Sequence, residues 1–329
     1  MRTAILLGAL AASLGAQQPM VENAQVQTHA FGGSLETQLS QLGAGPYWAG
    51  YSQPMVAGRH GDGCWNNGND GGRAPNAAVR LEGQTTMVVL IRMEAGKVDR
   101  INTTSPDCRL DGGGLAFHWF NNVPAAASVA WLKSQALGEK GGERAIYPIA
   151  MHQGPEADGA LDDLAMNGQP EKVRERAAFW LGGARGAHGV ETLKRMLASD
   201  ASVRVREQVI FALSNSKEPA GMAAVMDAAR NDKTPQIRSK ALFWIAQKAA
   251  AREAQDVIGK AVANDPERSV KEQAVFALKQ LPGDQGIPML IDVAKNNPDP
   301  AVRKKAMFWL GQSKDARALD FFASVLKQP

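Results

Sequence analysis

Cysteine, tyrosine and histidine are scarce in this 329-residue chain, which holds two, three and five of them respectively. The five histidines form no repeated or closely spaced set that could serve as a general acid–base group. After the first 16 residues, no apolar stretch approaches the roughly 20 residues that a membrane helix needs. Basic and acidic residues nearly balance, at 37 and 33, and no long run of like charges marks a nucleic-acid-binding arm. These shortages argue against membrane insertion, nucleic-acid binding and a bound cofactor, and leave a globular chain.

The first 16 residues have the pattern of a secretory signal peptide. Arg2 supplies the positive charge, Ala4 to Leu14 form a short apolar core, and residues 13–16 include small residues suited to a signal peptidase. The apolar core is too short to span a bilayer. The alternative is an ordinary hydrophobic helix at the N-terminus. We expect the segment to be removed and the protein to be periplasmic or secreted.

Export gives the two cysteines, Cys64 and Cys108, an oxidising environment, in which two cysteines of one domain usually form a disulfide. A competing hypothesis combines a thiolate with His60, Asp62 or His118, as a zinc site or as a Cys/His nucleophile pair. The spacing matches no compact zinc motif, and an oxidised cysteine is neither ligand nor nucleophile. Two free buried thiols are the remaining alternative. We therefore expect a disulfide and assign no catalytic, cofactor or metal residue.

A nine-residue pattern occurs five times in the C-terminal half, and its phenylalanines are 32, 32, 33 and 32 residues apart. Aliphatic, small and aliphatic residues at offsets 0, +4 and +8 predict one apolar helix face. Offsets +5 to +7 are apolar as well, which predicts a helix buried on several sides, with the phenylalanine in the core. A second amphipathic helix lies between successive copies and another, near 160–166, precedes the first. The copies are residues 173–181, 205–213, 237–245, 270–278 and 302–310, and the helices between and after them cover 190–197, 222–229, 257–262, 289–294 and 319–326.

This repeat resembles a HEAT repeat, and most closely the short HEAT-like kind first described in phycobilisome lyases. An acidic residue lies five positions before the Val or Ile in the second, third and fourth copies. In the fifth copy Asn297 takes this position. A basic residue follows the Val or Ile in all five. The resemblance covers residues 156–329 and implies an Asp–Arg ladder between repeats, although these bases could also track a phosphate backbone. The acids are Asp200, Asp232 and Asp265, and the bases are Arg174, Arg206, Arg238, Lys271 and Arg303.

The N-terminal half lacks the repeat and reads as a small α+β domain with a Gly/Asn-rich loop that begins at Cys64. It resembles the N-terminal module of some exported bacterial HEAT-repeat proteins. The expected fold class is therefore mainly α, with a signal peptide over 1–16, the α+β domain over 17–150 and an α-solenoid of antiparallel helix pairs over 151–329. Expected strands cover 24–31, 48–52, 86–94 and 97–103, and expected helices cover 34–42, 123–137 and 144–152.

Stacked helix pairs present an extended surface that usually binds protein. The leading hypothesis is a non-enzymatic scaffold of the cell envelope with an unidentified protein partner. The alternatives are a lyase-like enzyme, by resemblance to phycobilin lyases, and an envelope sensor that relays a signal. We place the partner on the second helix of each unit, taken as the inner face of the solenoid. Its exposed residues of mixed charge are Lys194, Arg195, Asp227, Arg230, Asp256, Lys260, Asp292 and Lys295.

Secretion from a bacterial host should yield a mature chain that begins near Gln17, because peptidases cut after a small residue that follows the apolar core. Intact-mass measurement of the secreted protein checks this. Secreted protein that retains Met1 would contradict the expectation.

Overall fold

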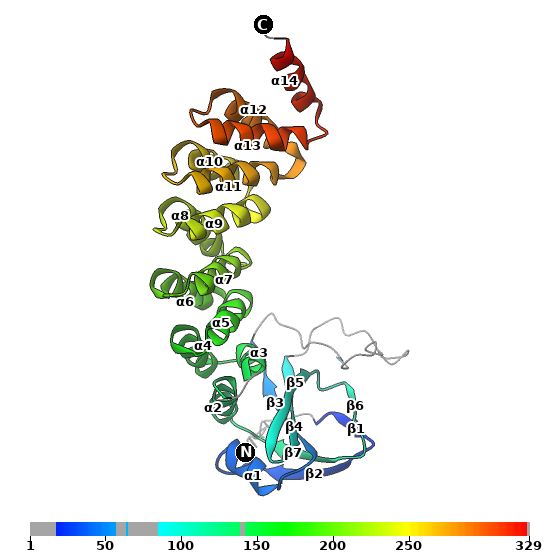
Figure 1. The fold of residues 1–329 in the computed structure, drawn as a ribbon. Coiled ribbons are helices and arrows are strands. Elements are labelled where there is room, and N and C mark those ends of the chain that lie inside the picture. The colour runs from blue at the N-terminus through cyan, green and yellow to red at the C-terminus, as the bar shows by residue number, and fades with distance from the viewer. Residues whose placement is uncertain (1–17, 57–63, 65–84, 139–141, 328–329) are drawn as a thin grey trace, which may run out of the picture. The chain divides into compact units, whose positions relative to one another are not determined.

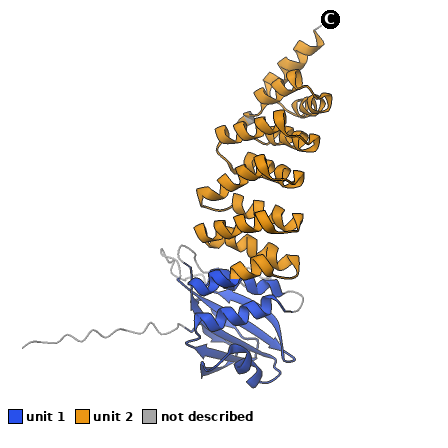
Figure 2. Ribbon diagram, turned by 90° about the vertical axis from the view of Figure 1, so that its left-hand side faces the viewer, with its two compact units in different colours: residues 1–160 blue, residues 161–329 orange. Residues whose placement is uncertain are grey.

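The computed structural model describes residues 18–56, 64, 85–138 and 142–327 (Figure 1), so the expected signal peptide and most of the Gly/Asn-rich loop lie outside it. The chain divides into two compact units, residues 1–160 and 161–329 (Figure 2). Unit 1 combines β-sheet with short helices, and unit 2 is helical throughout its described part. The expected fold class, a helical solenoid preceded by a small α+β region, is confirmed.

A five-stranded mixed sheet forms the centre of unit 1. Its order is β2-β7-β3-β4-β5, in which the first three strands are parallel and the last two pairings are antiparallel. The strands are β2 (Gln25–Ala30), β3 (Tyr47–Pro54), β4 (Thr86–Glu94), β5 (Lys97–Thr104) and β7 (Ala116–Asn121), and a separate parallel pair joins β1 (Met20–Glu22) to β6 (Arg109–Asp111).

The two faces of this sheet are covered by different elements. On one face lie the short helices α1 (Leu35–Gln41) and α2 (Ala125–Ala136), where the buried Tyr47 and Tyr51 hydroxyls bond to α1 and α2. On the other, a cluster of Val88, Leu90, Phe117 and Trp119 packs with Val21 and Leu110 of the small parallel pair. Burial on both faces accounts for the apolar character of the central strands.

Most of the elements expected in unit 1 are present, including the hairpin of β4 and β5, whose turn at Ala95-Gly96 has positive φ at both residues. The helix expected over 144–152 is a 3₁₀ turn (Gly142–Ala145) followed by α3 (Ile146–Met151). Strands β1, β6 and β7 were missed. Strand β7 is buried on both faces, so it lacks the polar–apolar alternation that identifies a half-exposed strand.

Unit 2 is a stack of helix pairs in which every expected second helix is present. Helix α4 contains the division between the units. The helices are α4 (Pro155–Asn167), α5 (Glu171–Ala184), α6 (Gly186–Ser199), α7 (Val203–Ser214), α8 (Pro219–Asn231), α9 (Pro235–Lys248), α10 (Ala251–Asn264), α11 (Arg268–Lys279), α12 (Ile287–Asn296), α13 (Pro300–Gly311) and α14 (Ala316–Leu326).

Glycine sets the close crossing of the two helices in several repeats. A Cβ on Gly189 would lie 2.1 Å from the Leu181 carbonyl oxygen, and a Cβ on Gly286 would lie 1.9 Å from that of Leu278. Gly221 meets Leu213 in the same way at 2.6 Å. A side chain at these positions would push the second helix of the pair away from the first, so the short repeat depends on them.

The odd-numbered helices α5 to α13 form one row and the even-numbered helices α6 to α12 form the other (Figure 1). Each odd helix packs closely on the next odd helix, whereas consecutive even helices touch sparsely. In a curved stack the more closely packed row lies on the inner side. The structure therefore places the odd helices, and not the second helices, on the inner side of unit 2.

The apolar positions of the nine-residue pattern are not equally buried. Ile237, Ala241 and Ile245, at offsets 0, +4 and +8, are fully buried, as is Leu242. The phenylalanines at offset +6 are only half-buried, and Phe308 is 54% exposed. At 3.6 residues per turn, the buried offsets 0, +4, +8 and +5 cover an arc of about 140°, and offset +6 lies about 170° from the centre of that arc. The expectation that these phenylalanines belong to the core is wrong.

Leu242→Ala should lower the free energy of unfolding by about 2–5 kcal/mol, the usual cost of truncating a buried leucine. The neighbouring Phe243→Ala should cost only about 1–2 kcal/mol, because part of that ring already contacts water. Urea unfolding of the two variants measures the difference. A larger loss for Phe243→Ala would contradict the helix orientation.

Candidate binding surface

The odd helices present a continuous solvent-facing strip, which we call the odd-helix face. It consists of the side chains at offsets −1, +2, +3 and +6 of the five copies. The phenylalanines run along its length, and charged and amide side chains flank them. Its main members are Phe179, Phe211, Phe243, Phe276 and Phe308, with Lys172, Glu175, Arg176, Arg204, Glu207, Gln208, Gln236, Lys240, Glu272, Gln273, Lys304 and Lys305.

Aromatic rings contact each other from repeat to repeat along this face. Phe179 and Phe211 stack with centroids 6.2 Å apart, and Phe211 lies 4.9 Å from Trp244. Further along, Phe276 lies 5.0 Å from Trp309. In the first, third and fifth copies, a tryptophan also meets the phenylalanine that precedes it edge-on, with ring centroids 4.8 to 5.0 Å apart. The result is an aromatic row that is partly open to solvent.

Polar side chains bridge neighbouring repeats beside the aromatic row. Arg204 reaches Glu175 of the preceding repeat at 2.6 Å, and Lys240 reaches Glu207 at 3.4 Å. Around Phe243 a hollow of about 510 Å³ is lined by polar side chains from three odd helices. The lining includes Glu207, Gln236, Ser239, Lys240 and Gln273. An aromatic floor with hydrogen-bonding walls suits a peptide more than a purely apolar ligand.

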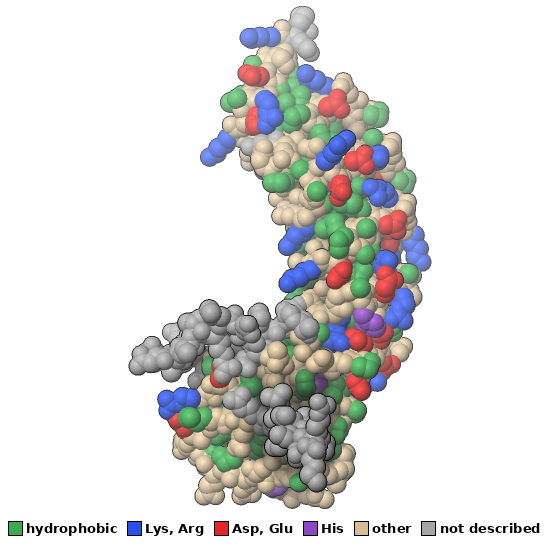
Figure 3. Space-filling view, turned by 180° about the vertical axis from the view of Figure 1, so that it is seen from behind, with side chains coloured by type: hydrophobic (Ala, Val, Ile, Leu, Met, Phe, Trp, Pro, Cys, Tyr) green, Lys and Arg blue, Asp and Glu red, His purple; other side chains and the backbone are tan. Residues whose placement is uncertain are grey.

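The two rows differ in charge. The five odd helices carry fourteen Lys and Arg against four Glu, whereas α6, α8, α10, α12 and α14 carry seven against six Asp and Glu. Three of the fourteen, Arg174, Arg206 and Arg238, are buried and paired with aspartates, so eleven remain. Figure 3, which views the chain from behind, shows basic and acidic side chains mixed over the repeats. The odd row is basic and the even row is nearly neutral.

A buried Arg–Asp ladder joins successive repeats beneath these surfaces. Arg238 donates from Nε and Nη2 to the two carboxylate oxygens of Asp265 in the next repeat, both at 2.8 Å. This hydrogen bonding raises the pKa of Arg238. The same pairing joins Arg174 to Asp200 and Arg206 to Asp232. The ladder implied by the HEAT resemblance is thus present, and these bases are occupied.

At the fourth step of the ladder, both the arginine and the aspartate are replaced by other residues. Lys271 stands where the earlier repeats have a buried arginine, and Asn297 stands where they have the aspartate. The same two repeats are joined instead by Arg268, which donates to Asp299 at 2.9 Å. The Arg268 side chain is 66% exposed, so this substitute is in contact with solvent.

The predicted partner-binding residues lie on α6, α8, α10 and α12 and are all exposed. Several make local ion pairs, such as Lys194 with Glu191 and Lys260 with Asp256, both at 2.9 Å. Arg195 pairs with Asp162 at 3.0 Å. A hollow of about 700 Å³ beside α6 and α8 is lined by alanines together with charged side chains, among them Lys194 and Asp227. Their role in binding stays a prediction.

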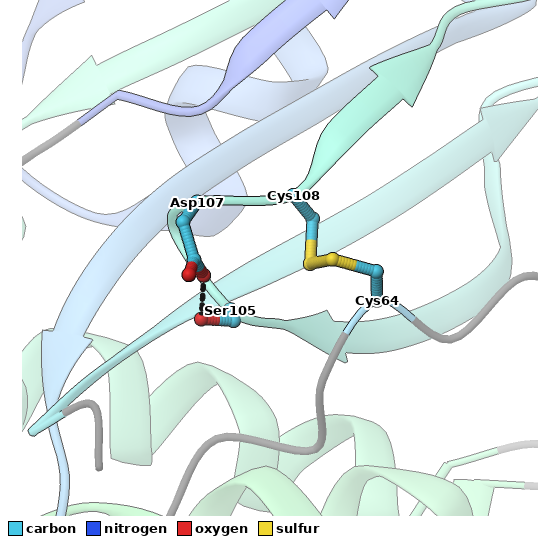
Figure 4. The surroundings of a disulfide bond; sticks show 4 residues. All are labelled: Cys64, Ser105, Asp107 and Cys108. Carbon is cyan, nitrogen blue, oxygen red and sulfur yellow. Dashed lines mark hydrogen bonds between the residues drawn. A yellow bond between two sulfur atoms is a disulfide. The ribbon is translucent and has the colours of Figure 1, made fainter. Parts of the chain in front are cut away.

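Cys64 and Cys108 form a disulfide, with Cα atoms 5.2 Å apart (Figure 4). Near it, Ser105 donates a hydrogen bond to the Asp107 carboxylate. Because both sulfurs are in the disulfide, neither cysteine can supply the thiolate that the zinc and nucleophile hypotheses require. His60 and Asp62 lie outside the described residues, as does the rest of the loop from residue 65 to 84.

His118 lies on β7 beside His29 and Tyr47. Its Nδ1 is 2.9 Å from Nε2 of His29, and its ring meets Tyr47 edge-on. Burial lowers the pKa of His118, and the neighbouring His29 adds to this effect. Among the described residues no group of three or more His, Cys, Asp or Glu is placed to hold a metal ion. The pair therefore reads as part of the sheet packing.

Sequence reasoning missed a buried serine–histidine contact. Ser128 on α2 lies 2.8 Å from Nε2 of His152 and 2.8 Å from the Tyr51 hydroxyl. Nδ1 of His152 donates to the Pro148 carbonyl oxygen at 2.6 Å, which leaves Nε2 as an acceptor for the Ser128 hydroxyl. All three side chains are fully buried. Their hydrogen bonds join β3, α2 and the end of α3 inside unit 1.

Arg238→Met should lower the free energy of unfolding by about 3–5 kcal/mol, because it leaves the Asp265 carboxylate buried without its partner. Lys271→Met, at the same position of the next repeat, should change it by less than about 0.5 kcal/mol, because Asn297 carries no charge there. Thermal or urea unfolding measures both. Equal losses would show that the ladder does not hold the repeats together.

A family model described as HEAT repeats matches residues 160–254 and 255–329. No curated protein matches the chain. Similar solved structures include human deoxyhypusine hydroxylase (16% identity, 60% of this chain and 84% of that one, TM-score 0.30). Another is the CpcE–CpcF complex of phycocyanin lyase from Nostoc sp. (20% identity, 48% of this chain and 98% of that one, TM-score 0.35).

A third is the Escherichia coli protein YibA (17% identity, 60% of this chain and 75% of that one, TM-score 0.36). TM-scores this low carry no argument about activity or partner. The family model, in contrast, covers more than half of the sequence and coincides with the helix pairs of unit 2. The chain belongs to the HEAT-repeat family.

Proposed function

We propose that this protein is a non-enzymatic scaffold, exported from the cell, that binds a partner protein along the odd-helix face. The observation that carries the proposal is the row of five phenylalanines, each partly exposed, at equivalent positions of five repeats. A single exposed aromatic residue is ordinary on a protein surface, but a repeated row beside a lined hollow is not. Aromatic side chains, including phenylalanine, are also enriched at the centre of protein interfaces relative to the rest of the surface.

The absence of turnover is part of the proposal, and two features support it. The disulfide occupies both cysteine sulfurs. The Ser128–His152 contact is enclosed in unit 1 and has no access to substrate. The lyase-like alternative has support only from the shared repeat type. The sensor alternative assigns ligand detection to unit 1, where the described residues offer the His29–His118 pair as the most distinctive polar group.

Export is supported by the signal-like N-terminal sequence and by the disulfide, which persists in oxidising compartments. No helix in the described part of the chain is long and apolar enough to cross a membrane. We place the protein in the periplasm or outside the cell.

The even-helix residues are the second candidate surface. The hollow beside α6 and α8 favours them, because two of the predicted residues, Lys194 and Asp227, line it together with several alanines. The near neutrality of this row gives it less electrostatic selectivity than the odd row has. The two surfaces are separable by mutation, because they lie on different helices.

Charge reversal on the odd row tests the proposal directly. The triple variant R176E/K240E/K305E changes offset +3 in the first, third and fifth copies. Capture of a specific protein from the cell-envelope fraction, quantified by mass spectrometry, should fall at least about tenfold, because each reversal turns an attraction into a repulsion. Melting temperature should stay within a few degrees, because all three side chains contact solvent.

The matched control is R195E/R230E/K260E, which reverses the same number of charges on the even row. It should leave capture unchanged. Loss of capture with the control alone would move the site to the even helices. Capture by neither the wild-type protein nor either variant would overturn the scaffold proposal.

A further inference from the structure

The charge and spacing of the odd-helix face point to the class of partner that it takes. We infer that the partner presents an acidic segment in extended conformation, with apolar side chains at about every third residue. This inference rests on the proposed function, in which the odd-helix face is the binding surface. It adds the chemistry of the ligand, which neither the HEAT fold nor the family assignment specifies.

The charge of the partner follows from the excess of bases on this row. The odd-helix face carries six bases against three glutamates, and the bases are Lys172, Arg176, Arg204, Lys240, Lys304 and Lys305. Two of those glutamates, Glu175 and Glu207, are already paired with Arg204 and Lys240. Steering by such a face favours a partner of opposite sign and raises its association rate.

The apolar content follows from the exposed rings. Phe243 lines the 510 Å³ hollow, and Phe308 is 54% exposed in the last copy. Covering these rings requires apolar groups, which a uniformly charged chain lacks. A wholly acidic tail would therefore gain little from this surface beyond screened attraction.

The spacing of the apolar groups follows from the repeat. Packed helices lie about 8–10 Å apart, and a peptide in the extended polyproline II conformation rises about 3.1 Å per residue with three residues per turn. Three residues of such a peptide thus advance by about one repeat and return to the same side of the chain, so every third side chain meets a new phenylalanine. The five phenylalanines therefore span about twelve residues of the peptide. The bases beside them can meet acidic residues of the peptide that lie between its apolar ones, and these bases are Lys172, Arg176, Lys240 and Lys305.

A nucleic acid is the competing occupant of a basic face with aromatic rings. The odd-helix face is less suited to it, because glutamates recur at offset +2 in the first, second and fourth copies. These are Glu175, Glu207 and Glu272. A phosphate backbone, which carries charge at every residue, would pass each of them, whereas a peptide can place an apolar or polar residue there.

Direct binding of synthetic peptides to the full mature protein tests the inference. The probe is a fluorescent peptide of about twelve residues with Leu at every third position and Asp or Glu elsewhere. Two further peptides replace the acids with Lys or the leucines with Ser. Unlabelled oligo(dT) of the same length serves as competitor. Fluorescence anisotropy is measured at about 0.05 M and about 0.3 M NaCl, because screening separates charge from apolar binding.

The acidic, leucine-bearing peptide should bind at least about tenfold more tightly than either replacement, with affinity that falls severalfold at the higher salt. R176E/K240E/K305E should weaken it at least about tenfold, and R195E/R230E/K260E should not. Phe308→Ser should weaken this peptide but not the serine peptide, since it removes an exposed ring and no charge.

Equal binding of the lysine peptide, or displacement by oligo(dT) at equal concentration, would overturn the acidic-peptide inference. If capture of a partner still depended on the odd row, the proposed function would stand without it. If instead capture were insensitive to the odd row, the proposed binding surface itself would be wrong. The two failures are therefore distinguishable.

Discussion

The buried arginine–aspartate pairing between repeats is the interaction on which unit 2 depends. Each guanidinium reaches forward into the next repeat, so it fixes both the distance and the rotation between neighbouring helix pairs. A buried charge without its partner is strongly destabilising. The pair therefore restricts each step of the stack to one geometry, and the surface features that recur in every repeat come into line as a consequence.

That alignment turns a repeated sequence pattern into a continuous surface. A phenylalanine on the side of the helix opposite the buried face would be an isolated exposed ring in a single helix. With the repeats in register, the rings stack on one another and on the tryptophans of later repeats. The same register lines up six of the bases of the odd helices along the odd-helix face, while the even helices remain nearly balanced in charge.

Much of this architecture was predictable from the sequence, and the exceptions have physical reasons. The 32-residue period and the apolar positions at offsets 0, +4 and +8 correctly predicted the helix pairs. The burial of Phe243 was predicted wrongly, because a pattern of apolar residues does not show which of them face solvent when a helix packs on both flanks. Strand β7 was missed because burial on both faces removes alternation. The Ser128–His152 contact joins residues 24 apart in sequence and leaves no local signal.

The loss of the ladder at Lys271 and Asn297 makes the stack mechanically uneven. Under tension along its axis, a chain of similar springs extends first at the softest one. Here that spring is the junction between α11 and α13, which is joined by Arg268 and Asp299 in contact with water in place of a buried pair. Dissolved ions weaken an exposed pair far more than an enclosed one. The stiffness of this junction therefore depends more on ionic strength than that of the three junctions with a buried pair.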